Sequence, residues 1–428
     1  MKKIALTLLI LGNIIMAATI DKIEVKGVHV PLIFEQDKRL PLVTMQFIFQ
    51  NSGSVADVKK AGLAKFSAKI MNEGTKTLGS SAFAEALESR AIHISASTGK
   101  ETFVIEMSCL SEEFDNGLKY FDMLLKEPNL TQESIKKVKT TTLGSLANKE
   151  NDFDYIASIE LKALMFEGTV LANPSAGSVE SVKSIELKDV EEFISKNIVS
   201  SKLIVAIGGD VDTDVVKDKV AKVIEAMSKG KSSDIKRYEV TKEPKEKIVT
   251  KETQQAYIYF GAPYNITVNA PEYHKARVAM FILGAGGFGS RLMEEIRVKR
   301  GLAYSAYAKM DITKSSGYMN GHLQTKLESL KEAKDTVKDV VGEFVKKGVT
   351  KEELEQTKKF ILGSEPLRVE TMSQRLSRTF MEFYNSQELG SSLKELEKIE
   401  KLKLKDLNEF IKAHTEILNM SFSIVTKP

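Results

Sequence analysis

The sequence predicts an α+β protein that consists of two homologous domains. Self-comparison supports this prediction, because residues 130–145 resemble residues 349–364 at a constant offset of 219. A second pair of segments, 187–194 and 404–411, matches at an offset of 217, with six of eight positions identical. Two separate matches at nearly one offset indicate a duplicated domain of about 200 residues, a period far too long for a solenoid.

Each half of the chain reads as strands, then helices, then a closing strand. Alternation of apolar and polar residues predicts the strands, and apolar residues at helical spacing predict the helices. In the first half we expect a strand at 43–49, a helix at 81–90, two strands within 92–108 and a closing strand at 203–207. In the second half we expect strands at 255–260, 317–323 and 421–425, and helices at 328–346, 351–362 and 405–413. Strands and helices that are segregated along the chain favour an α+β fold over a doubly wound sheet.

The predicted domain boundaries follow a polar segment between the halves. Residues 231–248 contain Pro244 and lack apolar periodicity, so we expect a surface linker there. The N-terminal domain then covers residues 19–230, and the C-terminal domain covers residues 249–428.

The N-terminus has the pattern of a secretory signal peptide. Two lysines follow Met1, residues 4–16 are apolar, and the small residues Ala17 and Ala18 come next. An apolar run of about 13 residues is short for a bilayer span, although an uncleaved anchor is an alternative. We therefore expect residues 1–18 to be removed, and the mature protein to be periplasmic without a membrane span.

Composition excludes several classes of function. Loss of the two N-terminal lysines takes the formal net charge from +4 to +2. A chain this close to neutral gives no indication of a nucleic-acid partner. Cys109 is the single cysteine, so an internal disulfide and a thiolate metal cluster are both excluded. Low cysteine usage in an export-targeted chain suits the bacterial periplasm.

A glycine-rich segment in the second half matches a cofactor motif only weakly. Gly284, Gly286 and Gly289 satisfy the dinucleotide fingerprint G-x-G-x-x-G. That fingerprint requires a preceding strand in a βαβ unit, whereas residues 272–283 have helical spacing. A flexible connector between two helices explains the glycines better than a cofactor site.

Three features of the chain together resemble a known family. They are the helical run at 61–69 with Asn-Glu-Gly-Thr at 72–75, the duplication, and Ser-Arg-Leu at 290–292 followed by residues 297–304. The chain resembles the pitrilysin/insulinase-type (inverted zincin) peptidases, specifically the short two-domain branch that includes mitochondrial processing peptidase. The resemblance covers nearly the whole mature chain. It implies two α/β-roll domains that form half of a clam-shell chamber.

The chain departs from that family at the metal site. The family motif H-x-x-E-H supplies two zinc ligands and a general base, but here the three positions are Lys65, Ala68 and Lys69. The family's third ligand, a later Glu, falls at Ser145. A protonated lysine has no lone pair for a metal, and deprotonating one at neutral pH costs roughly 4–5 kcal/mol. We therefore expect no metal or other cofactor in this chain.

Other family positions are retained. The resemblance gives Arg297 and Tyr304, seven positions apart, a role in stabilising the carbonyl that becomes an oxyanion. Alternatively, Arg297 is a surface helix residue and Tyr304 a strand residue packed on its neighbours. The resemblance also implies that an edge strand at 93–98 adds a peptide as an extra strand, an ordinary internal strand being the alternative. The substrate-binding positions expected from these motifs are Ser95, Ala96, Ser97, Gly286 and Gly287.

The leading hypothesis is an exported, non-catalytic subunit of a heterodimeric zinc peptidase. Its partner would be a paralogous chain with an intact H-x-x-E-H motif and bound zinc, and its substrate an unfolded or short peptide. A stand-alone peptide-binding or scaffold protein is the alternative. An independently active peptidase would need another metal site. The five histidines are scattered, and no nucleophile elbow supports serine chemistry.

Overall fold

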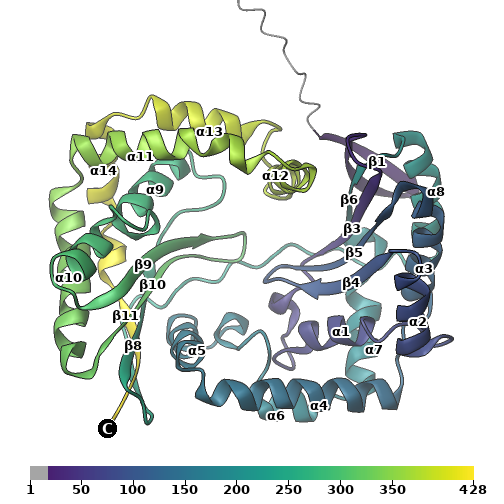
Figure 1. The fold of residues 1–428 in the computed structure, drawn as a ribbon, viewed down its shortest axis with the longest axis horizontal. Coiled ribbons are helices and arrows are strands. Elements are labelled where there is room, and N and C mark those ends of the chain that lie inside the picture. The colour runs from purple at the N-terminus through teal and green to yellow at the C-terminus, as the bar shows by residue number, and fades with distance from the viewer. Residues whose placement is uncertain (1–17) are drawn as a thin grey trace, which may run out of the picture.

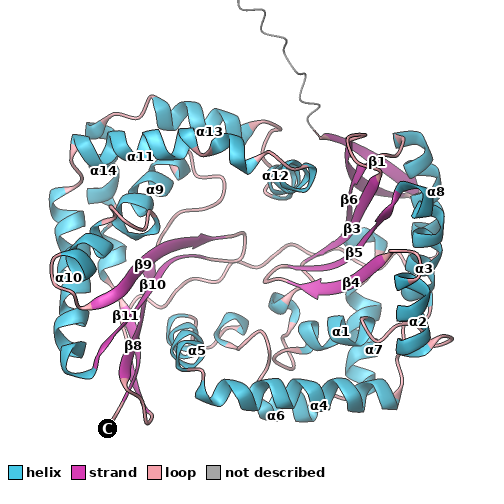
Figure 2. Cartoon of the chain, viewed as in Figure 1, coloured by secondary structure: helices cyan, strands magenta, loops and turns pink. Residues whose placement is uncertain are grey.

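The structure is a computed structural model that describes residues 18–428. Two α+β domains lie side by side, with helices on the outside and the two sheets turned toward each other (Figure 1). Figure 2 shows the strands gathered in two sheets with helices around them, which confirms the predicted fold class of two homologous α+β domains. The predicted signal peptide lies, apart from Ala18, outside the described residues.

The first domain contains a six-stranded sheet in the order β1-β2-β6-β3-β5-β4. Its strands are β1 Thr19–Val25, β2 Val28–Gln36, β3 Leu42–Gln50, β4 His93–Thr98, β5 Thr102–Leu110 and β6 Leu203–Gly209. Its helices are α1 Leu63–Met71, α2 Gly79–Glu88, α3 Phe114–Lys126, α4 Gln132–Asn148, α6 Val179–Ser184, α7 Leu187–Asn197 and α8 Thr213–Glu225. Strand β5 shows how the sequence sets the layers, because Phe103, Ile105, Met107 and Cys109 are buried in the helical core while the residues between them are half-buried.

The second domain repeats this plan with a five-stranded sheet in the order β7-β11-β8-β10-β9. Its strands are β7 Glu246–Thr250, β8 Gln255–Pro263, β9 Ala303–Ile312, β10 Gly317–Lys326 and β11 Ser421–Thr426. Its helices are α9 Tyr273–Met280, α10 Leu330–Lys347, α11 Lys351–Gly363, α13 Ser391–Glu400 and α14 Leu404–Ala413. The duplicated helices α4 and α11 have the same N-terminal capping motif, a capping box at Thr131 and at Thr350.

The two domains exchange one helix each. Helix α5 Phe153–Met165 packs on β8 and β11 of the second sheet, and α12 Met372–Tyr384 packs on β2 and β6 of the first. These helices are counterparts at the duplication offset of 219. Each lies against a strand glycine, since a Cβ at Gly208 would meet Leu376 Cδ1 at 2.6 Å and one at Gly261 would meet Met165 Sδ at 2.5 Å.

The segment between the domains begins and ends earlier than predicted. Helix α8 ends at Glu225, and β7 begins at Glu246, inside the linker predicted at 231–248. The prediction was wrong for the last three residues of that range because β7 is a mostly exposed edge strand, paired only with β11, and therefore lacks apolar alternation. Between residues 18 and 428, no helix is long and apolar enough to cross a membrane.

A buried ion pair holds α12 against the first sheet. Arg375 Nε donates to Glu35 Oε1 at 2.6 Å, and Arg375 Nη2 donates to Asp37 Oδ2 at 3.0 Å. Glu35 is only 3% exposed, and its burial raises the pKa of its carboxyl group despite the adjacent guanidinium. Removing Arg375 would therefore leave a buried carboxylate without its counter-charge.

We expect Arg375→Ala to lower the free energy of unfolding by about 3–5 kcal/mol, as for a broken buried ion pair. The matched control is Arg39→Ala, since Arg39 also pairs with Asp37 but its side chain is 66% exposed. The control should leave the free energy of unfolding nearly unchanged, because an exposed ion pair contributes little to stability. Denaturant unfolding measures both values, and equal losses would contradict the role of Arg375.

Candidate functional site

Helix α1 presents the predicted metal-motif positions, and two contacts fix where it begins. The Asp57 carboxylate accepts from the Gly62 N–H at 3.0 Å and from the Ala64 N–H at 2.7 Å, which satisfies the free amides of the first turn. Gly62 has φ +84°, and a Cβ there would meet Gly177 N at 2.6 Å, so only glycine fits. With the helix start fixed, Lys65 is exposed and Ala68 is buried.

The second lysine of the motif contacts the helix that should hold the third ligand. Lys69 Nζ donates to Thr142 Oγ1 on α4 at 2.9 Å. Burial, together with the charges of Lys65 and Lys149, lowers the pKa of Lys69. Ser145 lies about one turn beyond Thr142 on the same helix and is exposed. The structure thus brings α1 and α4 together, as the family spacing between the motif and Ser145 requires. Sequence reasoning missed the contact of Lys69 with Thr142.

These residues do not fit a zinc ion. The positions of the motif offer two ammonium groups, a methyl group and a hydroxyl, and ammonium groups repel a divalent cation. Across residues 18–428 the structure shows no group of three His, Cys, Asp or Glu side chains that could hold a metal. The residues on α1 therefore do not support metal-assisted chemistry in this chain.

Arg297 and Tyr304 come together on the second domain, with Phe288 as a third member. The Arg297 guanidinium lies 4.3 Å from the centre of the Tyr304 ring and 4.6 Å from that of Phe288. Tyr304 is 81% exposed and Phe288 is 70% exposed, so the alternative of a packed strand tyrosine is wrong. Sequence reasoning missed Phe288, although an aromatic residue between Gly287 and Gly289 was a usable signal.

This cluster lies far from α1 of the same chain. Tyr304 stands at the start of β9, and Asp311, near the other end of that strand, pairs with Lys100 of the first domain at 2.7 Å. Tyr304 is seven residues from Asp311 along the strand. At about 3.3 Å per residue, this places Tyr304 about 20 Å from the Lys100–Asp311 contact between the domains. Lys100 and Lys65 line one cavity. The two halves of the predicted site are thus apart within one chain.

The glycine-rich segment connects two π-helical turns, Phe281–Ala285 and Met293–Val298. Helix α9 precedes it, so the strand that a dinucleotide fingerprint requires is not there. Gly286 packs closely, since a Cβ would lie 2.7 Å from the Phe281 ring, and Gly287 has φ +63° with open space around it. The glycines therefore shape a turn that exposes Phe288.

The expected substrate strand is an edge strand, but part of its edge is already paired. Ala96 N–H donates to Asn72 Oδ1 at 2.7 Å, and Asn72 Nδ2 donates to the Ala96 carbonyl at 2.9 Å. Alternation directs the backbone groups of Ser95 and Ser97 toward β5. A peptide could pair with Ala96 only by displacing Asn72, whose amide already makes the two bonds of an added strand.

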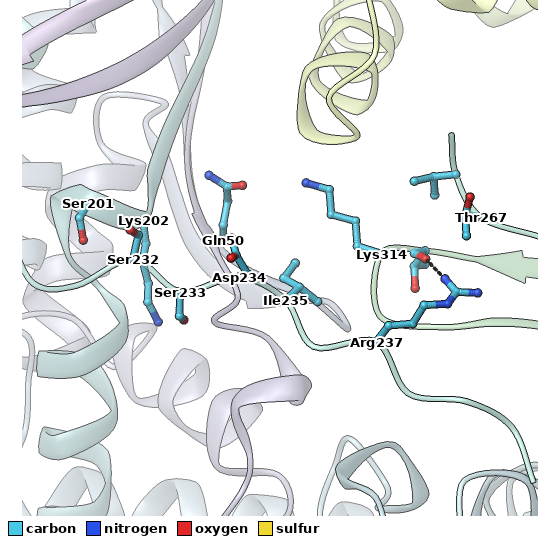
Figure 3. A pocket seen from close by; sticks show the side chains of 12 residues that line it. Gln50, Ser201, Lys202, Ser232, Ser233, Asp234, Ile235, Arg237, Thr267 and Lys314 are labelled. Carbon is cyan, nitrogen blue, oxygen red and sulfur yellow. Dashed lines mark hydrogen bonds between the residues drawn. The ribbon is translucent and has the colours of Figure 1, made fainter. Parts of the chain in front are cut away.

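A second cavity lies along the linker. It measures about 470 Å³ and is lined by side chains of both domains and by residues 232–235 and Arg237 between them (Figure 3). Arg237 donates to the carbonyls of Thr313 at 3.4 Å and Ile266 at 3.2 Å, and Lys202 donates to Asn197 Oδ1 at 2.7 Å. Arg237 ties the linker to the second domain and Lys202 is bonded within the first, so both cations are engaged and the cavity is a structural junction.

The fold and the site define a duplicated α+β protein with the inverted-zincin plan and with ammonium groups at the ligand positions. A family model described as insulinase (peptidase family M16) matches residues 38–178, and one described as peptidase M16 inactive domain matches residues 184–361. The chain belongs to peptidase family M16.

Relatives agree with this assignment. A Helicobacter pylori protein named non-peptidase homolog YmxG is 41% identical over 100% of this chain and 99% of its own length. A Bacillus subtilis protein named uncharacterized zinc protease YmxG is 23% identical over 74% of this chain and 76% of its own length. A solved structure described as a peptidase M16 inactive domain from Pseudomonas fluorescens superimposes with a TM-score of 0.87 at 22% identity, covering 96% of this chain and 98% of that one.

Zinc should not stabilise this protein. A metal that does not bind the native state does not shift unfolding, so excess Zn²⁺ should leave the thermal midpoint of the full chain unchanged. The positive control is the variant Lys65→His/Ala68→Glu/Lys69→His/Ser145→Glu, which rebuilds the motif. It should gain about 2.7 kcal/mol at a free zinc concentration about 100 times its Kd. A wild-type chain that keeps one equivalent of zinc after dialysis would contradict the assignment.

Proposed function

We propose that this protein is a non-catalytic subunit of a heterodimeric zinc peptidase, and that it supplies Arg297 and Tyr304 to the zinc site of its partner. One observation carries the proposal, which is the position of the exposed Arg297–Tyr304–Phe288 cluster. The rise of β9 places it about 20 Å from the contact between the two domains. A cluster that cannot reach α1 of its own chain is free to meet another chain. The name of the Helicobacter pylori relative, non-peptidase homolog, agrees with a silent subunit.

The cluster is preorganised for charge stabilisation. Two aromatic faces hold the guanidinium, and a stacked arginine keeps its N–H groups available at the edge of the plane. The guanidinium would donate to a peptide carbonyl as it becomes an oxyanion, and the exposed Tyr304 hydroxyl would add a second donor. Zinc and the general base would come from the partner, a paralogous chain with an intact H-x-x-E-H motif.

The same proposal places the protein in the periplasm. The basic start, the apolar run at 4–16 and the alanines at 17 and 18 support export. Unfolded or short peptides are the proposed substrates, because recognition along a strand edge relies on backbone groups and tolerates many sequences.

A stand-alone peptide-binding or scaffold protein is the second candidate. The observation that favours it is the edge strand β4, which leads into a cavity at the domain junction without involving Arg297. Peptide binding by the isolated chain, with no turnover in any mixture, would favour this candidate.

The experiment mixes the chain with a family member from the same genome that carries H-x-x-E-H and follows cleavage of a fluorogenic peptide. Arg297→Ala should lower kcat of the mixture by about 100-fold, the cost of losing one oxyanion donor. The matched control is Arg300→Ala, because Arg300 lies three positions away and pairs with Glu295 at the surface. Equal rates for wild type and Arg297→Ala would refute the role of the cluster.

A further inference from the structure

A cavity of about 210 Å³ lies where the two domains meet. Residues of both domains line it, among them Lys65, Lys100, Lys162, Phe166, Leu171 and Tyr318. We call the lysines and small polar side chains of this lining the polar wall, and its apolar side chains the apolar wall. The cavity therefore has the two-sided character of a binding site for an amphipathic ligand.

The lysines of the polar wall outnumber the carboxylates that pair with them. Lys100 Nζ is paired with Asp311 at 2.7 Å. The ammonium groups of Lys65 and Lys162 make no hydrogen bond or ion pair with any of residues 18–428. The Lys162 side chain is exposed to solvent, and desolvation by the surrounding protein together with the Lys100 charge lowers the pKa of its ammonium group. Three cations against one carboxylate leave this wall in need of an anion.

The apolar wall is rigid and small. Phe166 and Tyr318 pack edge to face with ring centres 5.2 Å apart, and both are almost fully buried. Val170 and Leu171 follow Phe166 on a short helical turn that begins at a Thr169 cap. This wall can accept a few apolar carbon atoms beside an anion held by the lysines.

The cavity also stands at the end of the edge strand β4. Strand β4 ends at Thr98, and Thr98, Gly99 and Lys100 continue directly into the lining. The outward backbone groups of Ala96 are occupied by Asn72, but Thr98 lies beyond that contact and points its backbone groups the same way. A chain that reaches the cavity along β4 would therefore meet it with one of its ends.

We propose that this cavity binds the free C-terminal carboxylate of a peptide whose last side chain is apolar, with Lys65 and Lys162 as the anion-binding groups. The inference deepens the peptide-binding half of the proposed function and rests on it, but it needs neither Arg297 nor a partner chain. The volume falls below the roughly 300–1,000 Å³ of pockets that enclose drug-sized ligands, which suits a chain end rather than a nucleotide. The apolar wall favours a carboxylate with a side chain over inorganic phosphate.

The test is fluorescence anisotropy of the full-length chain, without partner, at low ionic strength. The probe is Ala-Ala-Ala-Leu labelled at its N-terminus, as the free acid and as the C-terminal amide. The amide should bind about tenfold more weakly, because it cannot make charge-assisted hydrogen bonds to the lysines. This comparison uses the wild-type protein, so it does not depend on any variant folding.

Variants assign the effect to the cavity. Lys162→Met should weaken binding of the acid by about tenfold and leave binding of the amide unchanged, whereas Lys162→Arg should retain the preference for the acid. The matched control is Lys188→Met, since Lys188 is a highly exposed lysine of the same domain outside the lining. A thermal melt checks folding, and Lys162→Met should unfold near the wild-type temperature because the Lys162 side chain is exposed.

Several results would overturn the inference. They are equal binding of acid and amide, unchanged binding in Lys162→Met, or displacement of the probe by inorganic phosphate as effectively as by unlabelled peptide acid. The last would show a general anion site. None of these results bears on the Arg297 mixture experiment, and loss of activity there leaves this assay unaffected, so the two failures are distinguishable.

Discussion

The exchange of α5 and α12 is the constraint on which the rest of the structure depends. Each sheet covers one face with its own helices, and its second face packs against the helix from the other domain, together with residues of the linker. Gly208 and Gly261 leave room for those helices, and Arg375 ties α12 to Glu35 inside the contact. Separating the domains would expose both faces and strip a buried carboxylate of its counter-charge. The positions of α1, β4 and β9 relative to one another, and the cavity between the domains, follow from this exchange.

The positive charge of the two lysines on α1 explains why the metal-motif positions do not suit a zinc ion. A zinc site needs neutral imidazoles or anionic carboxylates that offer lone pairs, and Lys65 and Lys69 offer neither. The two lysines also differ from each other. Lys69 is half-buried and bonded to Thr142, so it fills the space between α1 and α4, while Lys65 faces the interdomain cavity. The helix that resembles a cation site by its frame therefore presents a positive surface, which attracts anions.

Periodicity was sufficient for most of the fold, because strands such as β5 and helices such as α14 bury one regular face. Self-comparison identified the duplication but not the exchange, since an offset shows which segments are homologous and not which sheet they cover. The linker prediction failed at β7 because an exposed edge strand needs no apolar alternation. Asn72 and Lys162 were missed for a different reason. Each acts on residues far away in sequence, and only the folded backbone brings Asn72 to Ala96 or Lys162 to Lys65.

The two proposed peptide contacts lie at opposite ends of β9. The lysine cavity is at the junction end, near Asp311, and the Arg297–Tyr304 cluster is at the other end, about 20 Å away by the rise of the strand. An extended peptide also advances about 3.3 Å per residue, so the two contacts are about as far apart as six or seven extended residues. One short peptide cannot occupy both within a single chain. In the two proposals, the cavity retains a chain end, the arginine acts on a carbonyl presented by another subunit, and the strand between them keeps the two contacts apart.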